Sequence, residues 1–459
     1  MADRLDKPSA DWESMAPYWR QVDTILEGAA AMREAGQEYL PQFPNESDTD
    51  YEFRRKCAKF TNVYRDIVEG LASKPFSQEL SIAEGAGNRI LELVEDIDGR
   101  GNNMHVFAGE TFFAGINRAI DWILVDYTRA DGLSTVEDER AAGARPYWVH
   151  VPAHTVIDVK SDVMQGREQL ILVKILQSPK NLLIYRRDGG KVTWESLEKN
   201  DKNEWIPIDG GEVTIGVIPL VPFITGRRKG SKWRFHPPMR DAADLQIELY
   251  QQETALKHIK TLTCFPMLAG NGVQPEVGGD GRPKPVPVGP QSVLYAPPNA
   301  DGSHGEWKWI ITDARTLTFL AEDIKETIRQ LREIGRQPLT AQSGNLTKIT
   351  TAVAAAKGNS AVQNWALQLK DALELAWKYT AMWLNESVEP EVKVFTDFGV
   401  DALEEQAPAW LIQMRQNGDI SGTTFREEMK RYGVLSPEFD EDEEKTLLQD
   451  DILTGQLEP

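Results

Sequence analysis

The acidic segment at Asp96 and Asp98 is the first place where residue types and spacing could support chemistry. Its pattern, Asp-Ile-Asp-Gly-Arg-Gly, resembles half of a calcium loop. An EF-hand loop needs an oxygen ligand at its fifth position and a glutamate at its twelfth. Those positions hold Arg100 and Phe107, so the segment is better interpreted as a turn.

His150 and His154 have the spacing of a zinc-binding HxxxH pair. Such a pair needs a helix, because residues four apart then lie on one face. Pro152 lies between these two and the context is extended, so they would not share a helical face. We expect a surface or core role for both histidines and predict no metal site.

Phosphate-binding and nucleophile motifs are missing from the sequence. Gly85-Ala86-Gly87 lacks the third glycine of a dinucleotide loop. The basic stretch from Gly226 to Lys232 does not match GxxxxGK[ST], and no P-loop occurs elsewhere. There is no GxSxG, and no Cys/His or Ser/His/Asp arrangement stands out. We therefore predict that the chain is not an enzyme, has no catalytic residues and uses no cofactor.

Two groups of cations remain as candidates for contact with a partner. Arg227, Arg228, Lys229 and Lys232 form one, and Lys348 and Lys357 flank a polar segment near the middle of the second half of the chain. The second pair could meet phosphate groups transiently. A solvated loop explains both groups equally simply.

Composition restricts the class of protein. The 459 residues are 41% hydrophobic and 27% charged, which is ordinary for a folded protein and long enough for several sub-structures. A formal charge of −20 argues against a tight non-specific grip on nucleic acid, although it is compatible with a surface past which DNA slides. Cys57 and Cys264 lie in no disulfide or metal spacing, the first residues resemble no secretory signal, and no apolar run is long enough to span a membrane.

Hydrophobic periodicity predicts an α+β chain. Residues 1–80 read as helices interrupted at Gly28 and Gly36, and residues 81–130 as further helix followed by a buried strand at 120–126. Residues 145–235 contain short strands of a mostly antiparallel β sub-domain, with a hairpin turn at Asp188-Gly189-Gly190. Two prolines in the segment 218–223 predict an edge or irregular strand there.

The second half of the chain is organised around two amphipathic helices that flank a polar segment. Asp313 is a good N-cap for the first of them, whose apolar stripe runs to Ile334 and stops at Gly335. The polar segment 337–348 follows, and then a long helix over 349–385. Gly358-Asn359-Ser360 either kinks that helix or marks the true end of the polar segment. An earlier helix is predicted at 237–265, a Gly/Pro-rich insert at 269–311, a strand at 391–396, and two helices with an acidic run near the C-terminus.

This order of elements resembles the portal proteins of tailed bacteriophages, which form the ring at the capsid vertex through which DNA is packaged. Short phrases along nearly the whole chain support the resemblance: Tyr39-Leu40-Pro41, Tyr51 to Arg54 with Phe60-Thr61-Asn62, Gly70 to Phe76, Ile218-Pro219, Ile334-Gly335-Arg336 with Pro338-Leu339, Trp365-Ala366, and Asp397-Phe398. Each phrase alone is weak, and their order carries the resemblance.

The resemblance implies a portal-type α+β fold. It divides the chain into a wing (1–236) with a helical and an antiparallel β part, a first stem helix (237–265), a clip (266–312), a second stem helix (313–336), a tunnel loop (337–348), a long kinked wing helix with a return strand (349–400), and a helical crown with a tail (401–459). A stem helix of about 24 residues is about 36 Å long, enough to line a channel. Polar residues mixed into both stem stripes fit helices that face a neighbour on one side and a water-filled channel on another.

The resemblance also implies function and partners. The chain would form a homo-oligomeric ring of twelve subunits with an acidic lining, pass double-stranded DNA during packaging and ejection, and contact the major capsid protein. It would dock the terminase large subunit during packaging and neck or adaptor proteins afterwards. The protein would be found in the virion and, during assembly, in the host cytoplasm, and it would have no membrane partner. The residues expected to face DNA are Gln342, Ser343, Asn345, Lys348 and Lys357, and those expected to dock partners through the clip are Arg282, Lys284, Trp307 and Trp309. The alternatives are a non-portal virion adaptor or scaffold, or a phage enzyme with an unrecognised site.

Overall fold

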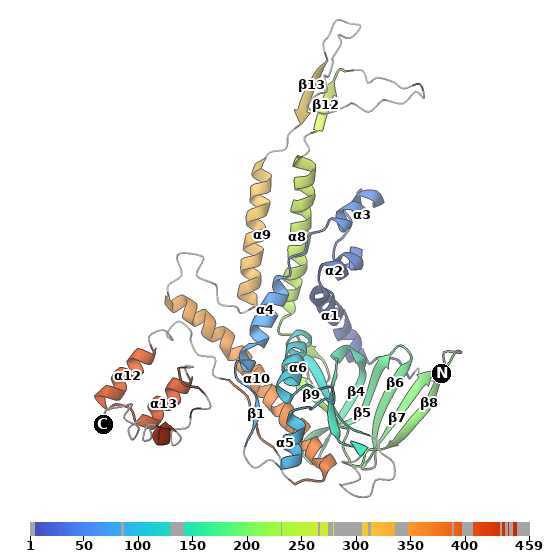
Figure 1. Cartoon of the computed structure of the whole chain (residues 1–459). Coiled ribbons are helices and arrows are strands. Elements are labelled where there is room, and N and C mark those ends of the chain that lie inside the picture. The colour runs from blue at the N-terminus through green and yellow to red at the C-terminus, as the bar shows by residue number, and fades with distance from the viewer. Residues whose placement is uncertain are drawn as a thin grey trace.

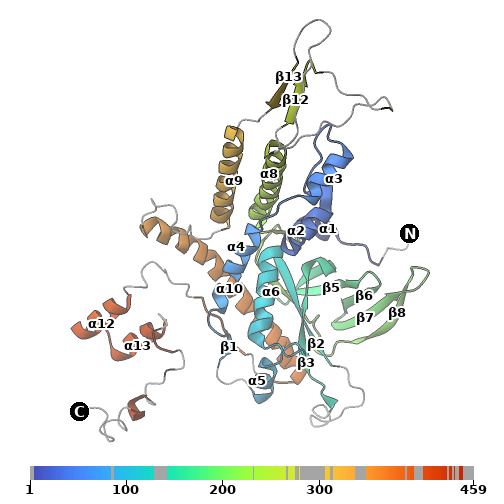
Figure 2. The ribbon, with the colours of Figure 1, turned by 45° about the horizontal axis from the view of Figure 1, so that its top comes forward.

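The computed structural model is an α+β protein in which two long helices project from a base of sheets and shorter helices (Figure 1). The structure describes residues 5–83, 87–128, 142–230, 232–264, 267–273, 279, 305–310, 314–335, 348–387, 390–396, 407–431, 434–436, 439 and 444–447. A two-stranded ribbon lies beyond the far ends of the long helices, and two C-terminal helices lie to one side (Figure 2). The predicted α+β class is confirmed.

Helices build the first part of the base. Ser9, Ser47 and Asn62 each accept a hydrogen bond from a first-turn amide and so cap α1, α3 and α4. Gly28 and Gly36 end α1 and α2 with positive φ angles, as their positions in the sequence predict. The helical elements are α1 (Ala10–Glu27), α2 (Ala29–Ala35), η1 (Gly36–Glu38), α3 (Asp48–Lys56), α4 (Val63–Ala72), η2 (Lys74–Phe76), α5 (Asn88–Val94) and α6 (Met104–Arg118).

A three-stranded antiparallel sheet occupies the centre of the base, in the order β3-β2-β9. Its middle strand β2 (Ile120–Tyr127) is buried over its first six residues, which confirms the predicted buried strand. The flanking strands are β3 (Pro146–Val151), followed by η3 (Ala153–Thr155), and β9 (Leu220–Ile224). β9 lies at the edge, where Pro222 costs no ladder hydrogen bond, as the prolines predict.

A second, five-stranded antiparallel sheet runs in the order β4-β5-β6-β7-β8. Its strands are β4 (Val156–Met164), β5 (Arg167–Ser178), β6 (Asn181–Asp188), β7 (Lys191–Lys199) and β8 (Trp205–Glu212). Asp188 pairs with Lys191 around Gly189 and Gly190, so the predicted hairpin turn is present. β8 is absent from the sequence prediction, because its Pro, Asp and Gly residues are poor strand formers and pairing with β7 is what holds it extended.

Two helices and a ribbon form the projecting hairpin. α8 (Arg240–Cys264) leads away from the base and α9 (Ala314–Ile334) returns beside it (Figure 1). Between them β12 (Met267–Asn271) pairs with β13 (Glu306–Ile310) as an antiparallel ribbon. The short strands β10 (Arg227–Arg228) and β11 (Phe235–His236) pair just before α8.

The long helix α10 (Lys348–Leu384) brings the chain back into the base. Its predicted apolar stripe is buried, from Val362 and Trp365 through Leu369, Leu373 and Trp377 to Leu384. The Trp377 ring lies 4.9 Å from that of Trp148, whose indole nitrogen donates to Thr380 Oγ1 at 2.9 Å. The helix is continuous through Gly358, so the interpretation that this glycine ends the preceding segment is wrong; enough turns on both sides hold it helical.

The remaining C-terminal elements are short. β14 (Val392–Lys393) pairs with β1 (Ser81–Ile82), so the strand predicted at 391–396 exists but is reduced to two residues. The helices predicted near the C-terminus are α12 (Ala407–Asn417) and α13 (Gly422–Arg431). None of the helices in the described ranges is long and apolar enough to cross a membrane.

Candidate functional site

Most of the residues predicted to contact DNA or partners lie outside the described residues. These are Gln342, Ser343 and Asn345 of the polar segment and Arg282 and Lys284 of the insert. Lys348 is the first residue of α10, and Lys357 lies about two and a half turns further along it. The roles proposed for these residues remain predictions.

The two tryptophans of the insert lie on the ribbon. Trp307 pairs across the ribbon with Gly270, and Trp309 pairs with Leu268. A Cβ atom on Gly270 would lie only 3.0 Å from the Trp307 ring, so the absence of a side chain there makes room for the indole. Trp307 is half-buried against its own ribbon. The Trp307 ring therefore packs over the backbone of Gly270 on the neighbouring strand.

α8 is held to the base by polar residues that interrupt its apolar stripe. The buried carboxylate of Glu253 accepts hydrogen bonds from Lys59 Nζ at 2.7 Å, from the Thr61 amide at 2.9 Å and from Thr61 Oγ1 at 2.7 Å. The buried Gln246 side chain accepts from the Tyr64 amide and donates to the Thr61 carbonyl, both at 2.9 Å. We call Gln246, Glu253, Lys59, Thr61 and Tyr64 the stem anchor.

The stem anchor shows what some of the polar residues of α8 contact. The resemblance implies stem helices with a neighbour on one side and a water-filled channel on another, and Gln246, Glu253 and Thr254 are buried on the side of α8 that meets the base. They satisfy backbone and side-chain groups of residues 59–64, the segment that leads into α4. A polar residue in a stripe fits either environment, and only the fold places residues 59–64 against α8.

α9 is fixed to the base at its C-terminal end. Arg332 Nη2 lies 2.9 Å from Asp66 Oδ2 on α4. Gly335 ends α9, as the sequence predicts, and its amide donates to the Leu331 carbonyl at 2.8 Å. A Cβ atom on Gly335 would lie 2.6 Å from Ile67 Cγ2, so this glycine also permits close packing of α9 on α4.

The outer face of α9 carries charges of both signs. Arg329 pairs with Glu326 at 2.6 Å and with Glu333 at 3.2 Å. The hydrogen bond from Arg329 lowers the pKa of Glu326 to about 2. α8 and α9 together contain seven Lys or Arg and eight Asp or Glu, whereas residues 401–459 contain five and fifteen. These two helices are therefore nearly neutral, and half of the net charge of −20 lies after residue 400.

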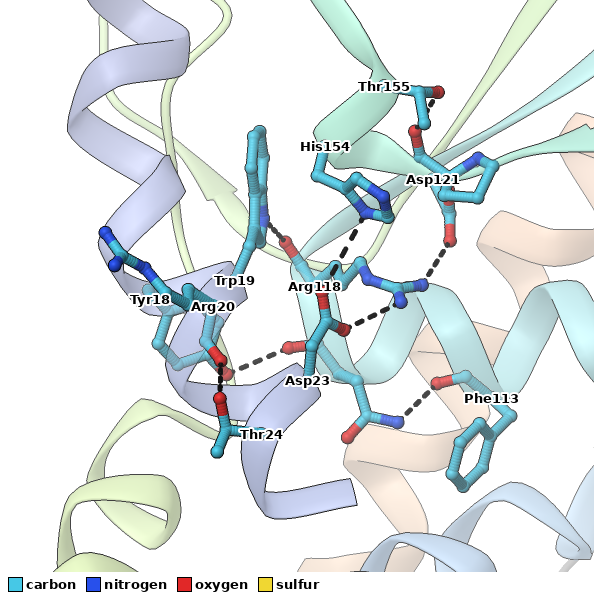
Figure 3. Close-up of polar contacts among 12 residues, drawn as sticks. Tyr18, Trp19, Arg20, Asp23, Thr24, Phe113, Arg118, Asp121, His154 and Thr155 are labelled. Atoms are coloured by element: carbon cyan, nitrogen blue, oxygen red, sulfur yellow. Dashed lines mark hydrogen bonds and ion pairs between the residues drawn. The ribbon is translucent and has the colours of Figure 1, made fainter. Parts of the chain in front are cut away.

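A second polar network joins α1 to α6 and β2 inside the base (Figure 3). Arg118 at the end of α6 binds Asp23 at 2.8 Å and the fully buried Asp121 at 3.4 Å. His150 Nε2 lies 3.0 Å from Asp121, and His154 Nδ1 lies 3.8 Å from Asp23. Burial lowers the pKa of His154 against the opposing effect of Asp23. These paired charges explain how Asp121 is tolerated in the core.

The side chains of the acidic and histidine motifs have polar partners within the protein. Asp98 Oδ1 accepts from the Arg100 amide at 2.9 Å and Asp96 Oδ1 from the Gly101 amide at 2.7 Å, so the predicted turn is present. His150 lies on β3 and His154 lies in η3, each beside a different carboxylate. Within the described ranges, no group of three or more His, Cys, Asp or Glu side chains is placed to hold a metal ion.

Arg228, one of the four cations in the basic stretch after β9, has a structural role. Arg228 lies on β10, binds Glu168 at 2.7 Å and stacks over the Trp233 ring at 4.5 Å. The solvated-loop interpretation is therefore wrong for Arg228, because β10 pairs with β11 and brings the aromatic ring beneath it.

One family model matches the part of the sequence that contains the hairpin and α10. A family model described as "Domain of unknown function (DUF4055)" matches residues 238–384, from just before α8 to the last residue of α10. No curated protein matches the sequence.

The similar solved structures, all three of the following at low identity, include chains from gene transfer agent (GTA) particles. A chain of the "Neck of empty GTA particle computed with C6 symmetry" is 12% identical with a TM-score of 0.41, covering 81% of this chain and 90% of that one. A chain of the "Virion of native gene transfer agent (GTA) particle" is 12% identical with a TM-score of 0.42, covering 87% and 98%. A chain of the "Neck of native GTA particle computed with C12 symmetry" is 12% identical with a TM-score of 0.37, covering 87% and 98%.

Proposed function

We propose that this chain is a portal protein: a non-enzymatic subunit of a ring at a capsid vertex, through which double-stranded DNA enters and leaves. The observation that carries the proposal is the hairpin of α8, ribbon and α9, which projects from the base and is followed by the polar segment and α10. The proposal rests on this arrangement and on the residue phrases given above, and not on the solved structures.

In this proposal the hairpin is the wall of a channel. α8 (25 residues) and α9 (21 residues) would be about 38 and 32 Å long at 1.5 Å per residue. The stem anchor and the Arg332–Asp66 pair would hold them at a fixed angle to the base. The mixed charges on the outer face of α9 would limit sticking to phosphate, since no continuous basic surface is formed there.

The remaining parts take the roles implied by the resemblance. The ribbon and insert, with Arg282, Lys284, Trp307 and Trp309, would dock the terminase large subunit during packaging and neck or adaptor proteins afterwards. The segment 337–348, with Lys348 and Lys357 nearby, would face DNA. Twelve copies would close the ring by head-to-tail contacts, and the energy for packaging would come from the partner ATPase.

Electron microscopy of the purified full-length chain tests the proposal. We expect rings of twelve or thirteen subunits with a central hole. A chain that remains monomeric across the micromolar range, or that associates into a closed particle without a hole, would favour an adaptor or scaffold instead. A monomer that turns over a substrate would favour the enzyme alternative.

A further inference from the structure

A cleft of about 580 Å³ opens between the five-stranded sheet and the end of β2. Tyr185 on β6, Trp194 on β7 and Ile208 on β8 line one side of it. Asp126 and Tyr127 on β2 and Trp383 on α10 line the other. The cleft lies on a different part of the base from the stem anchor, and neither the hairpin nor the histidine network uses it.

The lining is aromatic and acidic. It contains three tyrosines, two tryptophans and three carboxylates, and none of its described residues is Lys, Arg or His. Of the carboxylates, Glu212 at the rim pairs with Lys191 Nζ at 3.4 Å, so Asp126 supplies the central negative charge. Aromatic faces attract cations through their quadrupole, and carboxylates do so directly. The charge of the lining would repel phosphate or nucleic acid. The chemistry of the cleft therefore selects a cation with an extended apolar stem.

Two groups in the cleft have unused capacity for a hydrogen-bond donor. Tyr185 is 4% exposed and lines the cleft, and its hydroxyl is not one of the fully buried side-chain atoms that lack a partner among the described residues. Asp126 accepts from Tyr147 Oη at 3.0 Å and from the Tyr127 amide at 2.9 Å, which leaves part of its acceptor capacity unused. A ligand that donates to both groups would replace the water that reaches them through the cleft.

The mouth of the cleft adjoins an open sheet edge. β8 is the last strand of its sheet, and its residues 206–212 are exposed. An extended peptide can pair with such an edge and place alternate side chains into neighbouring pockets. Ile208, Asp209 and Glu212 belong to both the edge strand and the cleft, so one peptide could engage both.

We propose that the cleft binds the guanidinium or ammonium group of an Arg or Lys side chain, presented by an extended basic peptide of another polypeptide that pairs with β8. The cation would lie among the Tyr185, Trp194 and Trp383 rings and donate to Asp126 and the Tyr185 hydroxyl. This inference does not depend on the portal proposal, since the site lies within one subunit.

The test uses the full-length chain and the blocked peptide Ac-Thr-Val-Arg-Val-Thr-NH₂. Binding is detected by saturation-transfer NMR, in which the signals of the peptide are observed, and the affinity is obtained by titration. The matched probe replaces Arg by citrulline, which has nearly the same shape and no charge. We expect the citrulline peptide to bind at least about tenfold more weakly, the size of a lost charged hydrogen bond. Equal binding of the two peptides, or no binding of the Arg peptide, would overturn the proposal.

Variants locate the binding. Asp126→Asn removes a charge at the centre of the cleft, and the double variant Asp209→Asn with Glu212→Gln removes two at its exposed rim, where folding is least affected. The control Glu195→Gln lies on β7 next to Trp194 but on the opposite face of the sheet. We expect about tenfold weaker binding for Asp126→Asn, about threefold for the rim variant and no change for the control.

Two results would contradict the assignment. If Glu195→Gln weakens binding as much as the rim variant, the peptide is held by general surface charge. If millimolar MgCl₂ displaces the peptide while NaCl of equal ionic strength does not, the cleft is a divalent cation site. Should Asp126→Asn fail to fold, as judged by near-ultraviolet circular dichroism, the rim variant and its control decide the question.

Discussion

Replacing Glu253 by alanine tests whether the stem anchor holds the projecting hairpin to the base. The substitution removes three hydrogen bonds, one of them to the Lys59 ammonium, and leaves the Thr61 amide and hydroxyl without their partner. An unsatisfied buried donor costs about 1–3 kcal/mol. The Lys59 side chain is 56% exposed and regains water, so its share is small. We expect a loss of about 2–4 kcal/mol in the free energy of unfolding.

The control is Glu248→Ala, five residues earlier on the same helix. Glu248 is exposed and accepts one hydrogen bond, from Gln252 Nε2 at 3.2 Å, so its loss should change stability by no more than about 0.5 kcal/mol. Both substitutions replace Glu by Ala within α8 and have the same effect on helix propensity. The difference between them therefore reports the buried contacts.

Two measurements check this prediction. Urea unfolding followed by tryptophan fluorescence gives the loss of stability, and hydrogen exchange by mass spectrometry gives the protection of residues 59–64 and of α8. We expect faster exchange in both segments for Glu253→Ala and in neither for Glu248→Ala. Equal destabilisation by the two variants, or unchanged protection around Thr61, would refute the role of Glu253 as an anchor.

Three further predictions concern other parts of the structure. Gly335→Ala should lower the free energy of unfolding by about 1–3 kcal/mol, because the added Cβ would overlap Ile67. Ile67→Ala should lower it less in the Gly335→Ala background than in the unmodified chain, and additive losses in this double-mutant cycle would contradict the prediction. Because the pKa of His154 is lowered in the folded state, the unfolded chain binds more protons, and stability is lost as the pH falls below about 6.5. His154→Gln should reduce the change in the urea midpoint between pH 7 and pH 5. An unchanged pH dependence of the midpoint would refute this prediction. Deleting residues 337–348 should leave ring assembly intact by electron microscopy but impair DNA packaging, and normal packaging would count against the proposed DNA-facing role.

Local pattern was sufficient for many elements of the fold. The stripe from Val362 to Leu384 predicts the buried face of α10, because a helix buries residues three and four apart whatever its neighbour is. The β-rich run at 120–126 predicts the central strand β2. Asp188-Gly189-Gly190 predicts the hairpin between β6 and β7. Both predictions hold because each signal is contained within a few residues.

Elements that depend on a partner were missed. β8 has poor strand formers and is extended because β7 templates it. The cleft at Asp126 and Tyr185 was also missed, since an aromatic residue on a strand has the same pattern in a core as in a binding site.

What the sequence determines by itself is the order of most helices and strands, their buried faces and the acidity of the C-terminal region. Only the tertiary structure decides which groups the polar residues of α8 contact. Glu253 meets Lys59 and Thr61, residues more than 190 positions away, and this contact turns a polar interruption of a stripe into an anchor. The buried face of a helix or strand shows in the sequence as apolar residues at regular spacing. The partner of a buried polar group is set by packing between distant parts of the chain, which that spacing does not show.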